Sequence, residues 1–84
     1  MISICMATYN GEKYIKEQID SILPQLSKND EIIISDDSST DDTLSIIRSF
    51  NDHRIKIFSG CNFHSPISNF ENALKYAKGD YIFL

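Results

Sequence analysis

The feature that most constrains the fold is the stretch from Glu31 to Asp42, in which three consecutive isoleucines run into two adjacent aspartates. An apolar run of this length between polar residues is typical of a strand buried on both faces of a parallel sheet. Open α/β sheets bind ligands in the crevice outside the carboxyl ends of their strands. Asp36 and Asp37 come at that end of the predicted strand. The sequence therefore places two carboxylates where a ligand would bind.

Strands and helices alternate along the rest of the chain. Short apolar runs predict strands, and apolar residues three and four apart predict helices that lie with one face on a sheet. The further elements that we expect are a strand at 1–7, a helix at 12–23, a helix at about 40–50, a strand at 55–58, a helix from 66 closed by Gly79, and a strand at 79–84. This alternation favours an α/β fold with a parallel sheet and right-handed crossovers.

Polar residues just before the helical patterns predict where the helices begin. Asn10 is a candidate cap for the first helix, and Ser39 with Asp42 could form a capping box at the second. Ser65 precedes Pro66, the residue type that suits the first turn of a helix. Pro24 is expected to end or distort the first helix. The apolar stripe of the third helix is expected to consist of Ile67, Phe70, Leu74 and Ala77.

Length and charge exclude several classes of function. A chain of 84 residues with a net charge of −4 is one small domain at most and lacks the basic patch of a nucleic-acid-binding protein. No apolar run is long enough to span a bilayer, and no signal peptide is recognisable. Cys5 and Cys61 form no metal-binding spacing, so we expect a protein of the reducing cytoplasm, with Cys5 as a small core residue.

Familiar catalytic and phosphate-binding motifs do not account for the aspartate pair. Neither of the glycine-rich phosphate loops occurs, which argues against a dinucleotide dehydrogenase or a P-loop enzyme. A calcium loop starting at Asp36 would need glycine at position 41 and glutamate at position 47, where the chain has Asp41 and Ile47. No nucleophile-elbow motif supports Ser-His-Asp catalysis, and both histidines are expected to be polar loop residues.

A nucleotide would suit the pair better, because two neighbouring carboxylates repel each other and need a hydrogen-bond donor nearby. A carboxylate accepts from a uracil or thymine ring N–H or from ribose hydroxyls, and Tyr9 in the turn after the first strand could pack against a base. Two alternatives stay open at this point. Asp36 and Asp37 could form a solvated turn stabilised by the following helix dipole, and Tyr9 could be a packing residue at a strand end.

Four segments together resemble one known family. They read I-S-I-C-M-A-T-Y-N-G-E-K-Y-I, Q-I-D-S-I-L-P-Q, I-I-I-S-D-D-S-S-T-D-D-T and N-F-E-N-A-L-K-Y-A-K-G-D-Y-I-F-L. In this order and spacing, they look like the start of a family-2 glycosyltransferase, an inverting enzyme of the GT-A fold. The resemblance covers essentially the whole chain. It is closest to the bacterial branch that builds cell-surface polysaccharides, including rhamnosyltransferase-like members.

The resemblance implies a set of nucleotide-binding residues. Thr8, Tyr9 and Glu12 match the first-strand turn that contacts the nucleotide of a sugar donor. Asp37 matches the aspartate that binds base or ribose, with Asp36 beside it. The chain departs from the usual pattern twice: it has Ala7 where proline is frequent, and asparagine and phenylalanine at 69–70 where many members have arginine and asparagine.

The resemblance also implies that residues 1–84 are the N-terminal nucleotide-sugar-binding part of a larger domain, truncated before the D-x-D motif. We expect a Rossmann-like half domain with strand order third, second, first, fourth and the first helix on one face. The catalytic base and the ligands of a divalent cation, Mg or Mn, would lie outside this chain, which should be inactive alone.

The expected substrates of the full enzyme are a UDP- or dTDP-sugar donor and a glycan or lipid-linked acceptor. The enzyme would act in the cytoplasm, either free or at the inner face of the membrane. The alternative is a small non-catalytic binding module of flavodoxin type, such as a receiver domain. A receiver, however, would carry its acidic pair after the first strand, whereas here the pair follows the second.

Overall fold

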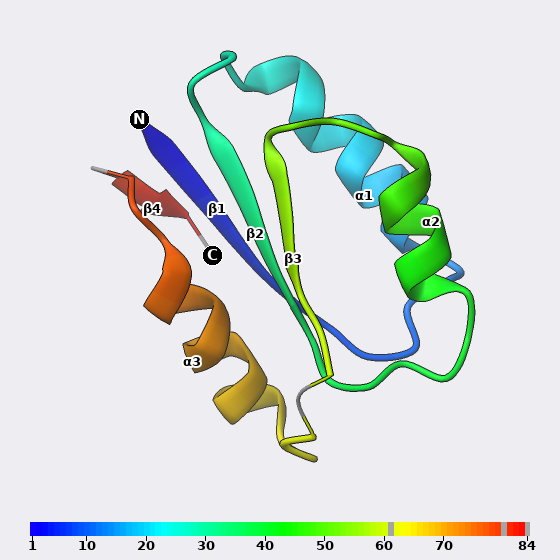
Figure 1. The fold of residues 1–84 in the computed structure, drawn as a ribbon. Helices are drawn as coiled ribbons and strands as arrows, with labels where there is room; N and C mark the ends of the chain where they lie inside the picture. Colours follow the sequence, from blue (N-terminus) through cyan, green and yellow to red (C-terminus); the bar gives the residue numbers. More distant parts are fainter. Residues whose placement is uncertain (61, 80, 84) are drawn as a thin grey trace.

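The computed structural model describes residues 1–60 and 62–79, and the backbone of residues 81–83 (Figure 1). In chain order the described elements are β1 (Ile2–Thr8), α1 (Ile15–Ile22), the 3₁₀ helix η1 (Leu23–Gln25), β2 (Glu31–Asp36), α2 (Thr43–Ser49), β3 (Ile55–Phe58), α3 (Pro66–Tyr76) and β4 (Tyr81–Phe83). The predicted alternation of strands and helices is confirmed. Across these ranges no helix is long and apolar enough to cross a membrane.

The four strands form one parallel sheet in the order β3-β2-β1-β4, as the sequence predicted. Thr8 at the end of β1 pairs with Asp36 at the end of β2, so these two strands finish side by side. β4 pairs with the first half of β1, from Ile2 to Ile4. The sheet thus brings the turns after β1 and β2 to a common carboxyl edge.

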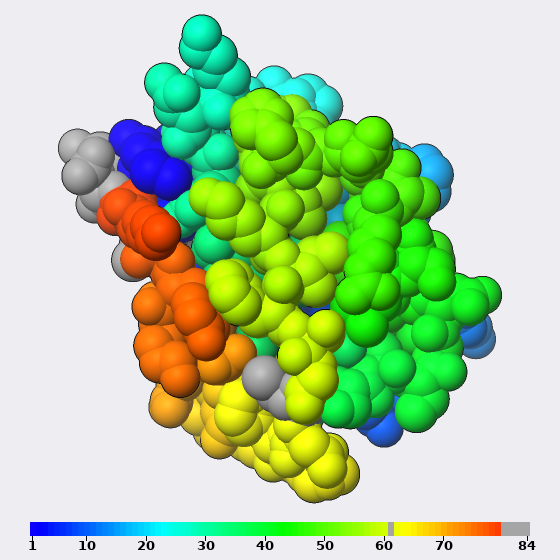
Figure 2. Space-filling view, in the orientation of Figure 1, coloured from blue at the N-terminus to red at the C-terminus, as the bar shows by residue number. Residues whose placement is uncertain are grey.

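Helices cover both faces of the sheet: α1 and α2 lie on one face and α3 on the other (Figure 1). The space-filling view looks onto the β3 edge, with α2 and α3 on its two sides (Figure 2). Ile32 and Ile34 of β2 pack with α1 and α2, whereas Ile33 packs with α3. All six residues of β2 are buried. The prediction that the isoleucine run is a strand buried on both faces is therefore confirmed.

Two of the predicted helix caps do not form, because their side chains bond to other loops. α1 begins at Ile15 rather than at residue 12, and the amide oxygen of Asn10 instead accepts from Thr40 N–H at 2.8 Å. α2 begins at Thr43, and the Ser39 hydroxyl instead accepts from Asn10 N–H at 2.9 Å and donates to Asp36 at 2.6 Å. Cross-loop bonds replace the local caps at both helices. Pro24 lies in η1, so the helix α1 ends before it, as predicted.

The third helix begins as predicted, with Ser65 as its cap and Pro66 as its first residue. Ile67, however, is 72% exposed rather than part of the core. In its place Asn69, which is 2% exposed, faces the sheet in the first turns and bonds to β1 and β2. The apolar packing of α3 comes from residues further along, namely Phe70, Ala73, Leu74 and Ala77.

Gly79 does not close α3, as the sequence had suggested. The helix ends at Tyr76, and Ala77 already has extended backbone angles. A Cβ added to Gly79 would lie 2.6 Å from the hydroxyl oxygen of Ser3, so glycine is needed here for close approach to β1. Two residues of the strand predicted at 79–84, numbers 80 and 84, lie outside the described residues, as does position 61, the second cysteine.

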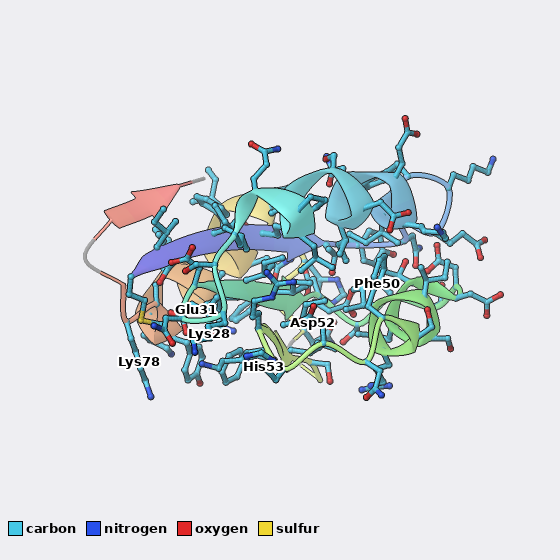
Figure 3. The ribbon with its side chains drawn as sticks, turned by 90° about the horizontal axis from the view of Figure 1, so that it is seen from above. Lys28, Glu31, Phe50, Asp52, His53 and Lys78 are labelled. Carbon is cyan, nitrogen blue, oxygen red and sulfur yellow. The ribbon has the colours of Figure 1, made fainter. Side chains whose placement is uncertain are left out.

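A buried carboxylate fastens the end of α3 to the amino edge of the sheet. Glu31 is 1% exposed, and its Oε2 accepts from the Ser3 hydroxyl at 2.6 Å and from Lys78 N–H at 2.9 Å (Figure 3). Its Oε1 accepts from the Lys56 ammonium at 3.0 Å. Burial alone would raise the pKa of Glu31, but these hydrogen bonds outweigh burial and lower it. Glu31 thus stays ionised and holds β1, β3 and the chain after α3 together.

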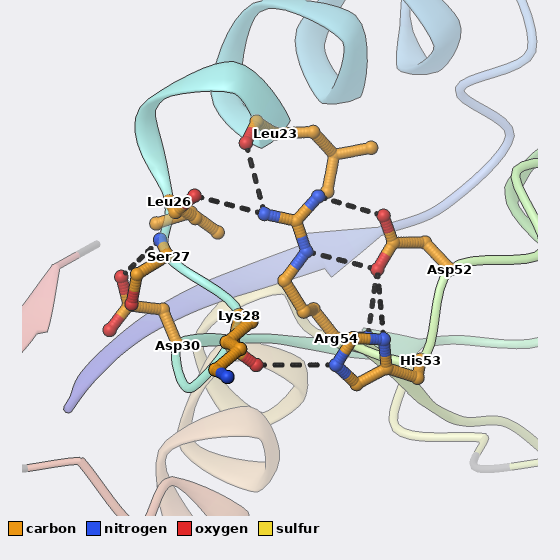
Figure 4. Close-up of polar contacts among 8 residues, drawn as sticks. All are labelled: Leu23, Leu26, Ser27, Lys28, Asp30, Asp52, His53 and Arg54. Carbon is orange, nitrogen blue, oxygen red and sulfur yellow. Dashed lines mark hydrogen bonds and ion pairs between the residues drawn. The ribbon is translucent and has the colours of Figure 1, made fainter.

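A second polar cluster fixes the segment between α2 and β3 (Figure 4). The Arg54 guanidinium donates to both carboxylate oxygens of Asp52, at 3.0 and 2.8 Å, and to the carbonyls of Leu23 and Leu26. Hydrogen bonds from Arg54 lower the pKa of Asp52 from 3.8 to about 2. Because the pKa is lower in the folded state, the ionised carboxylate stabilises the fold above pH 3.8, and this contribution is lost as pH falls toward 2.

We expect Asp52→Asn to remove part of the acid sensitivity of folding. At pH 6 the variant should be less stable than the wild type by about 1–2 kcal/mol, a value reduced for the partial exposure of the pair. At pH 2 the two proteins should be nearly equal. Urea unfolding at several pH values measures the difference. Asp20→Asn, which breaks the exposed Lys16–Asp20 pair, is the control and should leave the acid dependence unchanged. A difference for Asp52→Asn that does not vary with pH would contradict this account.

Candidate functional site

A cavity of about 310 Å³ opens at the carboxyl edge of the sheet. It lies where the end of β1, the residue after β2 and the beginning of α3 meet. Its lining residues are Ala7, Thr8, Tyr9, Asp37, His64, Ser65, Pro66 and Asn69. This is the position at which open α/β sheets bind ligands. It is also the place to which the sequence assigned the aspartate pair.

Asp37 supplies the carboxylate of the cavity. The residue is 7% exposed, and its backbone N–H donates to the Thr8 carbonyl at 3.0 Å. Its Oδ1 accepts from Phe63 N–H at 2.7 Å, which holds the loop before α3 against the end of β2. Among the described residues, no group donates to the other oxygen, Oδ2. Asp37 therefore keeps one acceptor for a ligand.

Asp36 points to the other side of the strand and does not line the cavity. It is fully buried, and its Oδ1 accepts from the hydroxyls of Thr8 and Ser39, both at 2.6 Å. Its Oδ2 accepts from Ser39 N–H at 2.8 Å. Both carboxylate oxygens are thus engaged within the protein. In this structure Asp36 ties the end of β1 to the loop after β2, and so positions the residues that do line the cavity.

Thr8 and Tyr9 form the β1 side of the cavity in different ways. Thr8 is 1% exposed, its hydroxyl donates to Asp36, and its carbonyl accepts from both Asp37 and Asn69. It therefore acts as a rigid wall. Tyr9 is 60% exposed, which leaves its ring accessible to a flat partner.

Glu12, like Asp36, lies in a contact that holds the loops together. It does not line the cavity. Its Oε2 accepts from Asp42 N–H at 3.3 Å, and its own N–H donates to Asp41 at 3.2 Å. Burial raises the pKa of Asp41, but hydrogen bonds from Thr43 and Glu12 more than offset this and lower it. These contacts hold the turn after β1 against the start of α2.

The α3 side of the cavity was missed by the sequence interpretation. His64 had been assigned to a polar loop, and Ser65 and Pro66 to the start of a helix; all three line the cavity. One signal could have placed these residues at the cavity. The helix starts after the third strand of a parallel sheet, and the loops that follow parallel strands lie at the same edge of the sheet. The burial of Asn69 had no signal in the apolar pattern.

No metal site is assembled in the described ranges. No three His, Cys, Asp or Glu side chains there are grouped so that they could hold a metal ion. The cavity lining contains a single carboxylate, Asp37. The residues described do not fit a divalent cation, and we assign no step of a reaction to one.

Comparison with known proteins places the chain among glycosyltransferases. The model of the family described as "Glycosyl transferase family 2" matches residues 3–84. The chain is 39% identical over 84 residues to "Putative glycosyltransferase EpsE" of Bacillus subtilis, covering 96% of this chain and 30% of that protein. It is 46% identical over 83 residues to "UDP-Glc:alpha-D-GlcNAc-diphosphoundecaprenol beta-1,3-glucosyltransferase WfaP" of Escherichia coli, covering 98% of this chain and 33% of that protein.

The fold agrees with the sequence relationship. The crystal structure of S. aureus TarS 1-349 in complex with UDP matches with a TM-score of 0.87 and 34% sequence identity. The match covers 99% of this chain and 26% of that one, so the chain corresponds to about a quarter of the solved structure. The GT-A fold predicted from the resemblance is thus confirmed for the described part of the chain. The family match across almost every residue shows that this chain belongs to glycosyl transferase family 2.

Proposed function

We propose that this chain is the donor-nucleotide-binding part of an inverting glycosyltransferase. In this proposal, residues 1–84 belong to a longer polypeptide that transfers a sugar from a UDP- or dTDP-sugar to a glycan or a lipid-linked acceptor. The observation that carries it is the nearly buried Asp37, which lines the cavity and keeps one carboxylate oxygen without a donor. The UDP complex of TarS and the UDP-glucose named for WfaP support the choice of donor.

The cavity residues would recognise the nucleotide by a hydrogen bond and a ring contact. Oδ2 of Asp37 would accept from the ring N–H of uracil or thymine, or from a ribose hydroxyl. A ring nitrogen that lacks a hydrogen, as in cytosine, would instead meet the carboxylate as a second acceptor and be repelled. The exposed Tyr9 ring would pack against the base. Thr8 would contribute a fixed wall, because its own polar groups are already bonded. Asp36 and Glu12, the other two predicted site residues, would act indirectly by holding the loops in place.

The transfer itself would use groups outside this chain. An acceptor hydroxyl would attack the anomeric carbon of the donor sugar as the bond to the nucleoside diphosphate breaks, which inverts that centre. A carboxylate base would take the hydroxyl proton. The ligands of a divalent cation, Mg or Mn, would likewise lie outside this chain. We place the enzyme in the cytoplasm, in peripheral contact with the membrane that carries a lipid-linked acceptor.

The proposal predicts activity in the longer polypeptide only. With an acceptor and a panel of UDP- and dTDP-sugars, that protein should release nucleoside diphosphate and form an inverted glycosidic bond. This chain alone should release none above background. Mass spectrometry and NMR of the product would identify the sugar and the anomeric configuration. If the chain were instead a non-catalytic binding module, a ligand would bind but neither protein would turn over a sugar donor.

A further inference from the structure

Asn69 lies in the cavity wall but has both ends of its side chain occupied. It belongs to the first turns of α3 and is 2% exposed. Its amide nitrogen donates to the Thr8 carbonyl at 3.1 Å, and its amide oxygen accepts from the Ser35 hydroxyl at 2.7 Å. A single side chain thus connects α3 with the ends of both β1 and β2.

The bond to Thr8 completes a three-way junction under the cavity. The Thr8 carbonyl also accepts from the N–H of Asp37 at 3.0 Å, so the two donors use both lone pairs of this oxygen. Asp37 in turn accepts from Phe63 N–H in the loop before α3. The wall that carries Asp37 and the wall that carries the start of α3 are therefore joined through one backbone carbonyl.

We propose that Asn69 is a positioning residue that sets the distance between the two walls of the cavity, and so controls nucleotide affinity without a hydrogen bond to the ligand. The inference rests on the proposed function, since it assumes that the cavity takes a nucleotide. It adds a residue that the resemblance did not assign to binding.

The effect of Asn69 on the cavity can be tested separately from its effect on folding, because other residues hold α3 on the sheet. The apolar contacts of the helix come from Phe70, Ala73, Leu74 and Ala77, which lie beyond Asn69 along the helix. These contacts remain when the amide is removed, so the helix should stay on the sheet. The first turn, in contrast, would lose its bonds to the strand ends. Its position relative to Asp37 would then vary, and ordering it would lower the observed affinity.

Asn72 offers a matched control one turn further along the helix. It is also an asparagine, is 7% exposed, and its amide nitrogen donates to the same Ser35 hydroxyl at 2.9 Å. It does not line the cavity. If both buried asparagines only stabilised the fold, replacing Asn69 or Asn72 would affect ligand binding equally.

The experiment compares Asn69→Ala and Asn72→Ala in the longer polypeptide by calorimetric titration with UDP, with thermal unfolding measured in parallel. We expect Asn69→Ala to weaken UDP binding about tenfold while the protein remains folded at the titration temperature. Asn72→Ala should bind within about twofold of the wild type. Equal dissociation constants for the wild type and a folded Asn69→Ala variant would overturn the proposal, as would equal losses for the two variants.

A milder variant keeps the test decisive if Asn69→Ala does not fold. Ser35→Ala removes one anchor of Asn69 and leaves its bond to Thr8. It also removes the bond from Asn72, a loss that Asn72→Ala measures separately. UDP binding should weaken about threefold relative to Asn72→Ala, and equal binding by these two variants would then overturn the inference. If the proposed function is wrong, the wild type itself will not bind UDP, and the inference about Asn69 is then wrong as well. If the wild type binds UDP and the variants bind it equally well, only the inference about Asn69 is wrong.

Discussion

Replacing Asp37 by alanine in the longer polypeptide is expected to weaken UDP binding about tenfold to a hundredfold. The physical reason is the loss of a hydrogen bond to a charged acceptor, worth ~1.5–3 kcal/mol. The bond would form at Oδ2, the oxygen to which no described residue donates. Calorimetric titrations with UDP and with dTDP give the dissociation constants directly.

Asp37→Asn separates the ligand contact from the contact with Phe63. Its amide oxygen can still accept from Phe63 N–H, but the group left for the ligand is then an NH₂ donor. An NH₂ group facing a ring N–H repels it, so this variant should lose as much affinity as Asp37→Ala if the contact is to the base. A ribose hydroxyl can accept from the NH₂ group, so a contact to the ribose would give a smaller loss. Asp42→Asn removes an equal charge from an exposed residue outside the cavity and should bind as the wild type does. Unchanged dissociation constants for both Asp37 variants would return this residue to a structural role in its loop.

The sheet could be predicted from the sequence because its signals are contained within single elements. Three isoleucines in β2 must be buried on both sides of the sheet wherever the neighbouring elements lie. The spacing of Ile15 and Ile19 likewise marks one face of α1 without knowledge of its partner. Such patterns report burial, and burial in an alternating chain is sufficient to predict a parallel α/β sheet.

The helix caps were harder to predict because they depend on competition between distant groups. Ser39 and Asn10 are good local caps by residue type. In the folded chain the two bond to each other's loops, since Asn10 N–H donates to the Ser39 hydroxyl at 2.9 Å. The partners are about thirty residues apart in sequence, so no local pattern reveals which bond prevails. Ile67 shows the same limit, because the geometry that exposes it is set by Asn69 bonding to two strands.

Only one wall of the candidate site, the one formed by the ends of β1 and β2, was predicted from the sequence. The buried strand predicted that the aspartate pair would lie at the carboxyl edge of the sheet, and the resemblance assigned both Asp36 and Asp37 to nucleotide binding, whereas only Asp37 lines the cavity. The opposite wall comes from the start of α3 and the loop before it, through His64, Ser65, Pro66 and Asn69. The sequence pattern thus located the edge of the sheet at which the cavity opens. The second wall of the cavity could be identified only from the folded structure.

Asp36→Ala is expected to lower the free energy of unfolding by about 2–4 kcal/mol, a large share of the stability of a small domain. The buried Asp36 carboxylate accepts from the Thr8 hydroxyl, the Ser39 hydroxyl and Ser39 N–H. Its removal leaves the Thr8 hydroxyl buried without this acceptor and releases the loop after β2 from the end of β1. Urea unfolding of this chain and of the variant measures the loss.

The neighbouring aspartate provides the control for this last prediction. Asp37→Asn keeps its bond to Phe63 N–H and should lower the unfolding free energy by less than about 1 kcal/mol, although it abolishes the proposed ligand contact. Stability should therefore depend far more on Asp36 than on Asp37, whereas the direct contact with the nucleotide depends on Asp37. An Asp36→Ala variant with an unchanged urea midpoint would show that the bonds to Thr8 and Ser39 contribute no net stability. The end of β1 would then have to be fixed by its strand pairing with β2 alone.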